Sequence, residues 1–329
     1  MFTFDTSNGM PKGTMNIPET ITVLNHGKTF EIGRLDGKGK LGGFCSFNNN
    51  GETGSNTWVV GNEEDWSWFG VVTGSGTAFT KVGEGKMTVR GKWDNNGAVR
   101  VNEGELCLNN GTLGTGSLVV AKGATLSGRT GDDLTNSAFT INGTCHVGAT
   151  ETATSGSIEF GNKNVTFATS SVLRLGIAKA ATKSNTGGGS LKNINRMNMN
   201  GVISLYYDDD LALEVGDSVV LWTASNSRGN PVLESNVIDE EKKLYWDTKN
   251  IVNGVLYVTD INPSGIEDIS VDATVQVNVV ASNGVSVNSY TCELRDVESV
   301  FNSMDLPKGV YMLNIAKDKK HKVIKVRKN

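Results

Sequence analysis

Two tryptophans, Trp66 and Trp68, lie beside an acidic run at residues 63–65. Aromatic faces can stack on sugar rings, and neighbouring carboxylates can accept hydrogen bonds from sugar hydroxyls. In a strand, alternate residues share a face, so the two indoles would lie side by side. The segment is therefore a candidate carbohydrate-binding platform. The alternative is an aromatic plug inside the fold, near its open end, which the same residues would also form.

Acidic residues cluster at two further places, and these are the only candidate metal ligands in the sequence. Carboxylate oxygens are the ligands that Ca²⁺ prefers. No Arg or Lys stands in a recognisable relation to them as a base, and solvated turn carboxylates are the simpler interpretation. We therefore expect no metal, no cofactor and no catalytic residue. The weak calcium candidates are Asp132, Asp133, Asp208, Asp209 and Asp210.

The histidines and cysteines are too dispersed to form a recognisable metal or nucleophile site. His26, His146 and His321 have no partner at metal-ligand spacing. No pair of cysteines has CxxC spacing, which excludes the common zinc and iron–sulfur patterns. The four cysteines are Cys45, Cys107, Cys145 and Cys292. Residues 37–42 spell GxGxxG, but a strand and a turn follow where a dinucleotide site needs a helix.

The composition indicates an all-β protein. The 329 residues include 40 Gly and only 5 Pro, and we find no long segment with an apolar face at helical spacing. A net charge of −4 gives no general attraction to nucleic acid. No apolar run reaches the roughly 18 residues that a membrane span needs. Residues 1–5 lack the features of a signal peptide, so we expect a fragment or a mature product.

Short apolar runs recur from residue 86 to residue 175 with a step of about twenty residues. One series lies at residues 97–101, 117–120, 138–141 and 157–160. A second, interleaved series lies at residues 105–108, 124–126, 145–147 and 165–167. One such coil cannot bury enough apolar surface to offset its chain entropy, so neighbouring coils must stack. The pattern predicts a parallel β-solenoid, with an antiparallel sandwich as the competing interpretation.

Period-two alternation assigns the side chains of the second series to two faces. The inward columns are expected to be Leu106/Leu108, Ala124/Leu126, Cys145/Val147 and Val165/Phe167. Cys107 and His146 are expected to point outward, where His146 would be solvated. Cys107 and Cys145 would then face opposite ways and remain free thiols.

A separate module begins after the turn-rich residues 262–265. Residues 274–280 alternate between polar and apolar side chains, and residues 282–284 have the composition of a hairpin turn. Residues 306–315 and 322–327 supply two more strands. Residues 317–329 carry seven Lys/Arg and one Asp, which we interpret as a solvated strand edge.

Residues 58–61, 69–72 and 80–89, with the later Trp246-Asp247-Thr248, resemble the autotransporter-associated β-strand repeat. The similarity covers roughly residues 35–260. The resemblance implies a right-handed parallel β-helix used as a stalk or an adhesive surface. It suggests a leader or partial coil at residues 1–34 and a passenger-like domain at residues 35–261.

The C-terminal residues resemble the C-terminal sorting domain of the type IX secretion system. The matching positions are Gly284, Leu306, Pro307, Gly309, Val310 and Tyr311, followed by a Lys-rich end. The resemblance implies a seven-strand sandwich at residues 262–329 that the outer-membrane export machinery recognises. Within the motif, Pro307 would fix φ where the strand begins, Gly309 would permit a turn with positive φ, and Tyr311 would enter the sheet.

These features together predict a secreted or surface-attached structural or adhesive β-solenoid, followed by a small antiparallel sandwich. The expected partners are the secretion machinery and a glycan or host surface, with no nucleic acid and no membrane span. We do not expect an enzyme. The alternative is a non-catalytic glycan-binding or spacer module of a larger polysaccharide-degrading enzyme of the lyase type.

Overall fold

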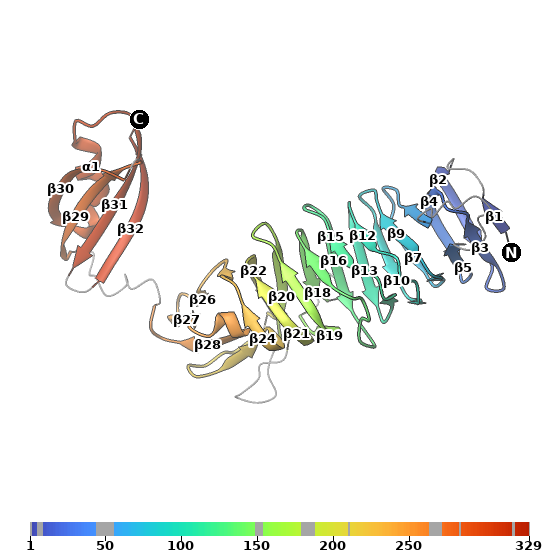
Figure 1. Ribbon diagram of the computed structural model, residues 1–329. Helices are drawn as coiled ribbons and strands as arrows, with labels where there is room; N and C mark the ends of the chain where they lie inside the picture. Colours follow the sequence, from blue (N-terminus) through green and yellow to red (C-terminus); the bar gives the residue numbers. More distant parts are fainter. Residues whose placement is uncertain are drawn as a thin grey trace. The chain divides into compact units, whose positions relative to one another are not determined.

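The computed structural model describes residues 2–4, 9–43, 56–148, 154–178, 188–209, 211–262, 272–282, 284–317 and 320–328. Residue contacts divide the chain into two compact units (Figure 1). The first comprises residues 1–236 and 247–258, and the second residues 237–246 and 259–329. Nearly all the regular structure is β-strand. No helix in the described ranges is long and apolar enough to cross a membrane.

Two long parallel sheets build the first unit (Figure 1). The eight-stranded sheet contains, in spatial order, β25 (Val232–Leu233), β22 (Val202–Tyr207), β20 (Val172–Ile177), β18 (Thr144–Val147), β16 (Thr125–Arg129), β13 (Glu105–Asn109), β10 (Lys86–Val89) and β7 (Trp66–Trp68). The ten-stranded sheet contains β2 (Met10–Ile17), β4 (Thr29–Gly37), β6 (Asn56–Val60), β9 (Thr77–Lys81), β12 (Val99–Val101), β15 (Leu118–Val120), β17 (Phe139–Ile141), β19 (Gly156–Phe167), β21 (Gly189–Met199) and β24 (Trp222–Arg228).

From β6 to β18 each coil contributes one strand to each of these two sheets, and several coils add a short strand to a smaller sheet. Each strand pairs in parallel with the strand of the same sheet one circuit later. In the eight-stranded sheet Met87 pairs with Leu106, Leu106 with Leu126, and Leu126 with Cys145, in steps of 19 or 20 residues. The predicted period is therefore confirmed over this stretch, and the antiparallel interpretation is wrong for it.

The circuit lengthens after β18. The fourth member of each predicted series therefore does not lie where a constant step of twenty residues places it. Cys145 pairs with Leu173, 28 residues later, and Leu173 with Ile203, 30 residues later. Val165–Phe167 consequently pairs with Phe139–Ile141 in the ten-stranded sheet and not with β18. Residues 157–160 form the first part of the same long β19, where the carbonyl of Glu159 accepts the Leu134 N–H.

Smaller strands complete the first unit. A parallel sheet contains β1 (Phe2–Phe4), β3 (Thr22–Asn25), β5 (Lys40–Gly43) and β8 (Val71–Thr73). A two-stranded parallel sheet joins β11 (Lys92–Trp93) to β14 (Thr112–Leu113). Near the end of the unit, β23 (Ser218–Val220) and β28 (Val255–Thr259) pair antiparallel, and η1 (Ile251–Asn253) precedes β28. The predicted boundary between a leader or partial coil at residues 1–34 and the passenger-like domain falls inside β4, and the strands before it pair within these sheets.

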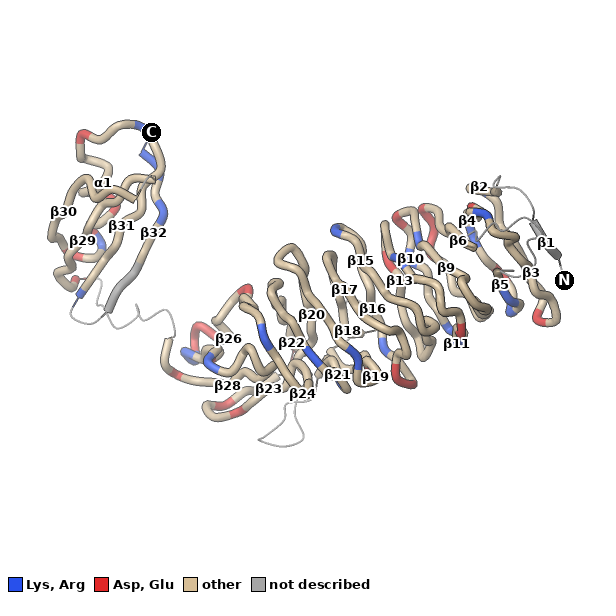
Figure 2. The backbone as a smooth tube through the Cα atoms, in the orientation of Figure 1, with Lys and Arg blue, Asp and Glu red and all other residues tan. Residues whose placement is uncertain are grey.

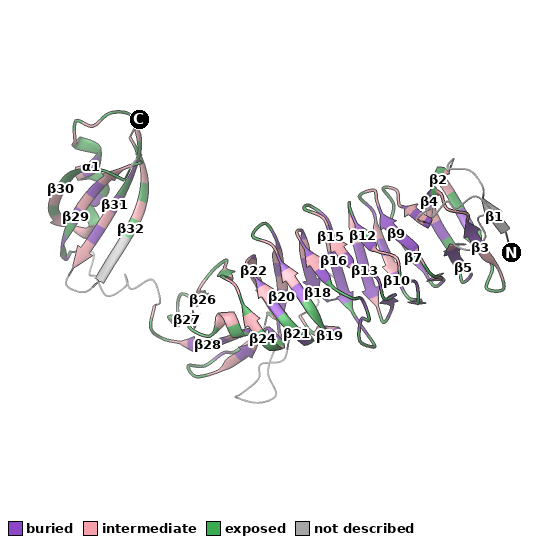
Figure 3. Ribbon diagram, in the orientation of Figure 1, coloured by how far each residue is buried: buried purple, intermediate pink, exposed green. Residues whose placement is uncertain are grey.

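The core consists of apolar columns that run from coil to coil between the sheets (Figure 3). The inward columns predicted for the second series are buried as expected at Leu106, Leu108, Ala124, Leu126, Cys145 and Val147. Val165 and Phe167 are also buried, but in the other sheet. Each coil covers the apolar edges of its neighbours, so burial depends on the stack.

Glycines bring the turns of successive coils into close contact. A Cβ atom added at Gly85 would lie 2.0 Å from the carbonyl oxygen of Glu64 in the preceding coil. A Cβ atom added at Gly83 would lie 2.5 Å from the carbonyl oxygen of Asn62, and φ at Gly83 is 72°. Side chains at these positions would push the coils apart, which explains the glycines in the stretch 80–89.

Cys107 and His146 lie on the sheet face opposite Cys145, as alternation predicts, but both are buried, with exposures of 2% and 5%. Thr88 and Ser127 flank Cys107 in the stack and cover its small side chain. The expectation that His146 is solvated is therefore wrong.

Tyr206 covers His146 from a later coil. The Tyr206 hydroxyl lies 2.9 Å from His146 Nε2. Tyr206 pairs with Gly176 of the preceding coil. The Arg174 guanidinium lies 5.1 Å from the centre of the Tyr206 ring.

The predicted free thiols are confirmed at Cys107 and Cys145, and Cys292 is also free. Burial raises the pKa of the Cys145 thiol to about 12, so this thiol is poorly reactive. Cys45 lies outside the described residues.

The described strands of residues 272–328 form one antiparallel sheet in the order β30-β29-β31-β32 (Figure 1). Their bounds are β29 (Thr274–Ala281), β30 (Ser286–Glu293), β31 (Gly309–Lys317) and β32 (Lys320–Lys328). The 3-10 turn η2 (Leu294–Asp296) leads into α1 (Val297–Ser303), whose Val297 and Phe301 cover one sheet face. The second unit also contains the strands β26 (Val237–Asp239) and β27 (Leu244–Asp247), which pair antiparallel. The last residue of β27, Asp247, belongs to the first unit.

The prediction of a seven-strand sandwich is not met by residues 272–328. Their described strands lie in a single sheet, and α1 packs where a second sheet was expected. The sequence pattern behind this difference is Val297 and Phe301, which are four residues apart and so share one helix face.

Lys81 occupies an inward column that is otherwise apolar. It pairs with Val60 on one side and Val101 on the other, and its side chain is fully buried. Its Nζ donates hydrogen bonds to the carbonyls of Val82 at 2.9 Å, Gly83 at 2.7 Å and Glu103 at 3.3 Å. The ammonium also lies 5.6 Å from the centre of the Trp66 ring. It thus ties the turn after β9 to the turn of the following coil.

Burial lowers the pKa of Lys81 to about 8, although the nearby carboxylates of Glu103 and Glu84 act in the opposite direction. The unfolded chain keeps this proton up to the ordinary lysine value of 10.5. Between these values the unfolded state binds more protons, so the Lys81 contribution to stability rises with pH.

We predict that wild type gains unfolding free energy relative to Lys81→Met as pH rises from about 8 to about 10.5. Urea denaturation of both proteins across this range measures the difference. A stability difference that is flat with pH would contradict a buried, desolvated ammonium.

Candidate sorting site

The structure places the predicted aromatic platform inside the fold. Trp66 is 4% exposed and Trp68 is fully buried. Trp68 packs edge-on against Trp93, with ring centres 5.9 Å apart. A side chain without exposed surface cannot stack on a sugar, so the carbohydrate-binding assignment of Trp66 and Trp68 is wrong. The alternative of an aromatic plug agrees with their burial.

Most of the weak calcium candidates are separated or already bonded. Asp132 forms an ion pair with Lys92, and both Asp133 carboxylate oxygens accept hydrogen bonds from Asn193 Nδ2, at 3.0 and 2.9 Å. Within the described residues no group of three His, Cys, Asp or Glu side chains is placed to hold a metal. Asp208 and Asp209 lie in the loop after β22, and Asp210 is outside the described residues.

The predicted sorting-motif residues gather at one end of the C-terminal sheet, because Ala281, just before the Gly284 turn, pairs with Tyr311 at the start of β31. Gly284 closes the hairpin between β29 and β30, and its φ of 83° is one that glycine adopts without strain. The Gly284 N–H donates to the Ala281 carbonyl at 2.9 Å, which forms the tight turn. The predicted hairpin turn is therefore confirmed at Ser282 and Gly284. Asn283 lies outside the described residues.

Leu306, Pro307 and Tyr311 anchor the start of β31. Tyr311 is buried in the sheet core and meets the Phe301 ring at a centre distance of 5.6 Å. Its hydroxyl donates to the Pro307 carbonyl at 2.7 Å. Leu306 packs against the same core. The motif thus folds back on itself and fixes the path by which the chain enters β31.

Gly309 does not have the conformation that the sequence suggested. Its φ lies outside the left-handed region, and a Cβ there would meet only Tyr311 Cε2 at 3.7 Å and the Pro307 oxygen at 3.9 Å. These are ordinary contacts, so a side chain fits the backbone at this position. The prediction that Gly309 provides a positive-φ turn is wrong.

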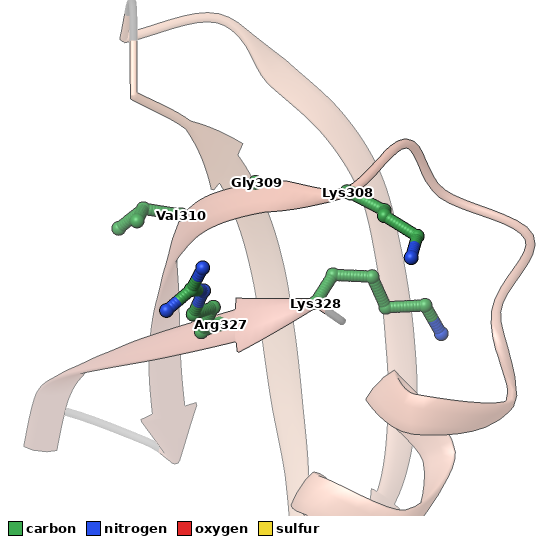
Figure 4. A pocket seen from close by; sticks show the side chains of 5 residues that line it. All are labelled: Lys308, Gly309, Val310, Arg327 and Lys328. Atoms are coloured by element: carbon green, nitrogen blue, oxygen red, sulfur yellow. The ribbon is translucent and has the colours of Figure 1, made fainter.

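A basic pocket opens between the start of β31 and the end of β32 (Figure 4). It has a volume of about 440 Å³ and is lined by Lys308, Gly309, Val310, Arg327 and Lys328. Sequence analysis noted the basic tail and interpreted it as a solvated edge. It missed Lys308, which the antiparallel register brings beside Arg327 and Lys328. Cross-strand pairing of the two segments could have indicated this cluster.

The Tyr311 hydrogen bond has a measurable consequence. We predict that Tyr311→Phe destabilises the domain by about 1 kcal/mol, because only the bond to Pro307 is lost. Tyr311→Ala should cost about 3–5 kcal/mol, because it also leaves a cavity beside Phe301. Hydrogen exchange of residues 272–328 in the full chain measures both changes. Equal effects of the two substitutions would contradict this division of roles.

Comparison with known families agrees with the C-terminal geometry. Residues 262–329 match the family model described as the secretion system C-terminal sorting domain. No curated protein matches the chain. The match implies export through the type IX secretion system to the cell surface or beyond, and an interaction with the secretion machinery. Residues 262–329 are a type IX C-terminal sorting domain.

Proposed function

We propose that this chain is a surface-exposed β-solenoid that acts as a stalk or adhesive surface and is exported by its C-terminal sorting domain. The observation that carries the proposal is the combination of a sorting domain at residues 262–329 with a parallel stack of coils before it. Stacked coils give a long, cooperative scaffold whose length is set by the number of repeats.

We infer that the stacked region is a right-handed parallel β-helix of the passenger type. Its strands alternate between two parallel sheets with a step near twenty residues. Lys81, Gly83 and Gly85 lie in the stretch that resembles the autotransporter-associated repeat, and each has a role at the contact between coils. These contacts support the resemblance at residues 80–89.

The surface of the first unit supports a scaffold better than a catalytic site. Acidic and basic residues are interspersed along the coils (Figure 2). Asp132 and Asp133 bond to neighbouring side chains. The glycan-binding alternative depended on Trp66 and Trp68, and their burial removes its basis. We therefore propose that the chain itself is a scaffold without enzymatic activity.

An export assay tests the proposal. The full chain, placed behind a periplasmic signal peptide, should reach the surface or the medium in a host with a type IX system. It should remain in the periplasm in a matched strain that lacks the outer-membrane translocon. Protease treatment of intact cells distinguishes the two locations.

A chain that ends at Ile261 is the matched control, and it should remain in the periplasm of both strains. Surface exposure that is independent of the translocon or of residues 262–329 would contradict the proposed route of export.

A further inference from the structure

Polar side chains form two rows on the outer face of β19, β21 and β24, in the ten-stranded sheet. Residues that pair in neighbouring parallel strands point to the same side of the sheet, so the register defines each row. We name the residues of the two rows together the donor face. The first row contains Asn164, Arg196 and Asn226, and the second contains Thr166, Asn198 and Arg228.

The donor face is open to solvent. Val165 and Met197 lie between the two rows and are fully buried, so alternation along the strands turns both rows outward. Within the donor face Thr166 and Asn198 are half-buried, and the other members are exposed. The two rows therefore form one accessible surface.

The donor face is positively charged. β19, β21 and β24 together contain four basic residues and one acidic residue, Glu159. Glu159 lies beside Lys192, outside the two rows, and accepts a hydrogen bond from Ser157 Oγ at 3.0 Å. Among the described residues, no ion pair includes Arg196 or Arg228. Both guanidinium groups are therefore available to an anion.

Neighbouring amides fix the orientation of two asparagines of the donor face. Asn195 Nδ2 donates to Asn164 Oδ1 at 3.0 Å, and Asn200 Nδ2 donates to Asn198 Oδ1 at 3.3 Å. These bonds turn the two oxygens toward the neighbouring amides and leave the Nδ2 groups of Asn164 and Asn198 for a ligand. An Nδ2 group and a guanidinium both donate hydrogen bonds and accept none. A ligand that fits this surface is therefore rich in acceptor oxygens.

The two kinds of donor indicate the class of ligand. A guanidinium binds both oxygens of a carboxylate, whereas a neutral amide N–H binds an uncharged oxygen such as that of a hydroxyl group. Arg196 belongs to β21 and Arg228 to β24, so two successive coils each supply one guanidinium among amides. An acidic polysaccharide carries carboxylates and hydroxyl groups along one extended chain, which matches this combination.

Two other polyanions match the donor face less well. Single-stranded nucleic acid is held largely by bases that stack on aromatic side chains, and the donor face contains no aromatic residue. An anionic membrane is bound by surfaces that also insert apolar side chains, and the donor face has none. Trp66 and Trp68 belong to the other long sheet and take no part in this surface.

We propose that the donor face binds an acidic polysaccharide, with carboxylates on Arg196 and Arg228 and hydroxyl oxygens on the amide groups. The proposal rests on the proposed function, because it names the class of surface to which the solenoid adheres. Successive coils repeat the contact along the stack, so an extended polymer can bind several coils at once.

Binding of the purified full chain to a fluorescein-labelled oligogalacturonate tests the ligand class. The methyl-esterified form of the same oligosaccharide is the matched control, because it keeps the hydroxyl groups and lacks the charge. We expect wild type to bind the free acid at least about tenfold more tightly than the ester, with an affinity that falls as salt is added. Fluorescence anisotropy measures the two dissociation constants.

Two variants test the donor face itself. Arg196→Gln/Arg228→Gln removes both guanidinium groups and should weaken binding to the free acid by at least about tenfold. Asn198→Asp keeps the oxygen that accepts from Asn200 but replaces the donor with a second oxygen, so it should weaken binding by about tenfold as well. Circular dichroism and urea denaturation verify that each variant remains folded.

The matched control variant is Lys122→Gln/Arg129→Gln, which removes the same charge from exposed positions outside the donor face. Lys122 follows β15, and Arg129 ends β16 in the eight-stranded sheet. This variant should bind the free acid as tightly as wild type.

Several outcomes would overturn the proposal. These are equal binding of the free acid and the ester, an equal loss in the control variant, or wild-type binding by the folded Arg196→Gln/Arg228→Gln chain. Tighter binding to a single-stranded oligonucleotide or to vesicles of anionic phospholipid through the same residues would also overturn it, because the ligand would then be a different polyanion.

The export assay separates failure of this inference from failure of the proposed function. If wild type is exported by the type IX route but does not prefer the free acid, the ligand assignment is wrong while the exported scaffold stands. If wild type is not exported by that route, the proposed function fails whatever the donor face binds.

Discussion

The hydrogen bonds between successive coils are the constraint on which the first unit depends. A single coil of about twenty residues loses more chain entropy than its few inward side chains can offset. Stacking supplies the missing stabilisation in two ways. The backbone groups of each strand form hydrogen bonds with the next coil, and the apolar columns become continuous. The parallel registers from Met87 through Leu106 to Leu126 show this pairing directly. Each coil is therefore stable only through its neighbours.

The polar groups inside the stack follow from the same constraint. Turns of adjacent coils approach so closely that Gly85 has no room for a side chain. Their carbonyls point along the stack, and the buried Lys81 ammonium binds carbonyls of its own turn and of the next coil. An apolar residue of similar size would fill the column but would leave these oxygens without that donor. The glycines and the lysine therefore serve the spacing between coils.

Sequence periodicity predicted the all-β class, the parallel stack and the inward columns, because stacking repeats one pattern at a nearly constant step. It failed at Val165–Phe167, where the coil lengthens and a fixed step no longer assigns strands to sheets. Alternation placed His146 on the outer face but could not show that Tyr206, sixty residues later, would cover it. In the sorting domain the motif predicted the hairpin at Gly284. It did not give α1 or the basic pocket, which depend on pairing between segments distant in sequence.

Deletion of one whole coil tests the stacking account most directly. Removal of residues 106–125 joins Glu105 to Leu126. Leu126 occupies in the next coil the position that Leu106 occupies in its own coil. The shortened chain should keep its strand content and unfold cooperatively in urea. Removal of residues 106–115 deletes half a coil and shifts the inward columns out of register, so this chain should fail to fold cooperatively. If the two deletions proved equally harmful, or the half-coil deletion were the better tolerated, successive coils would not be equivalent layers of one stack.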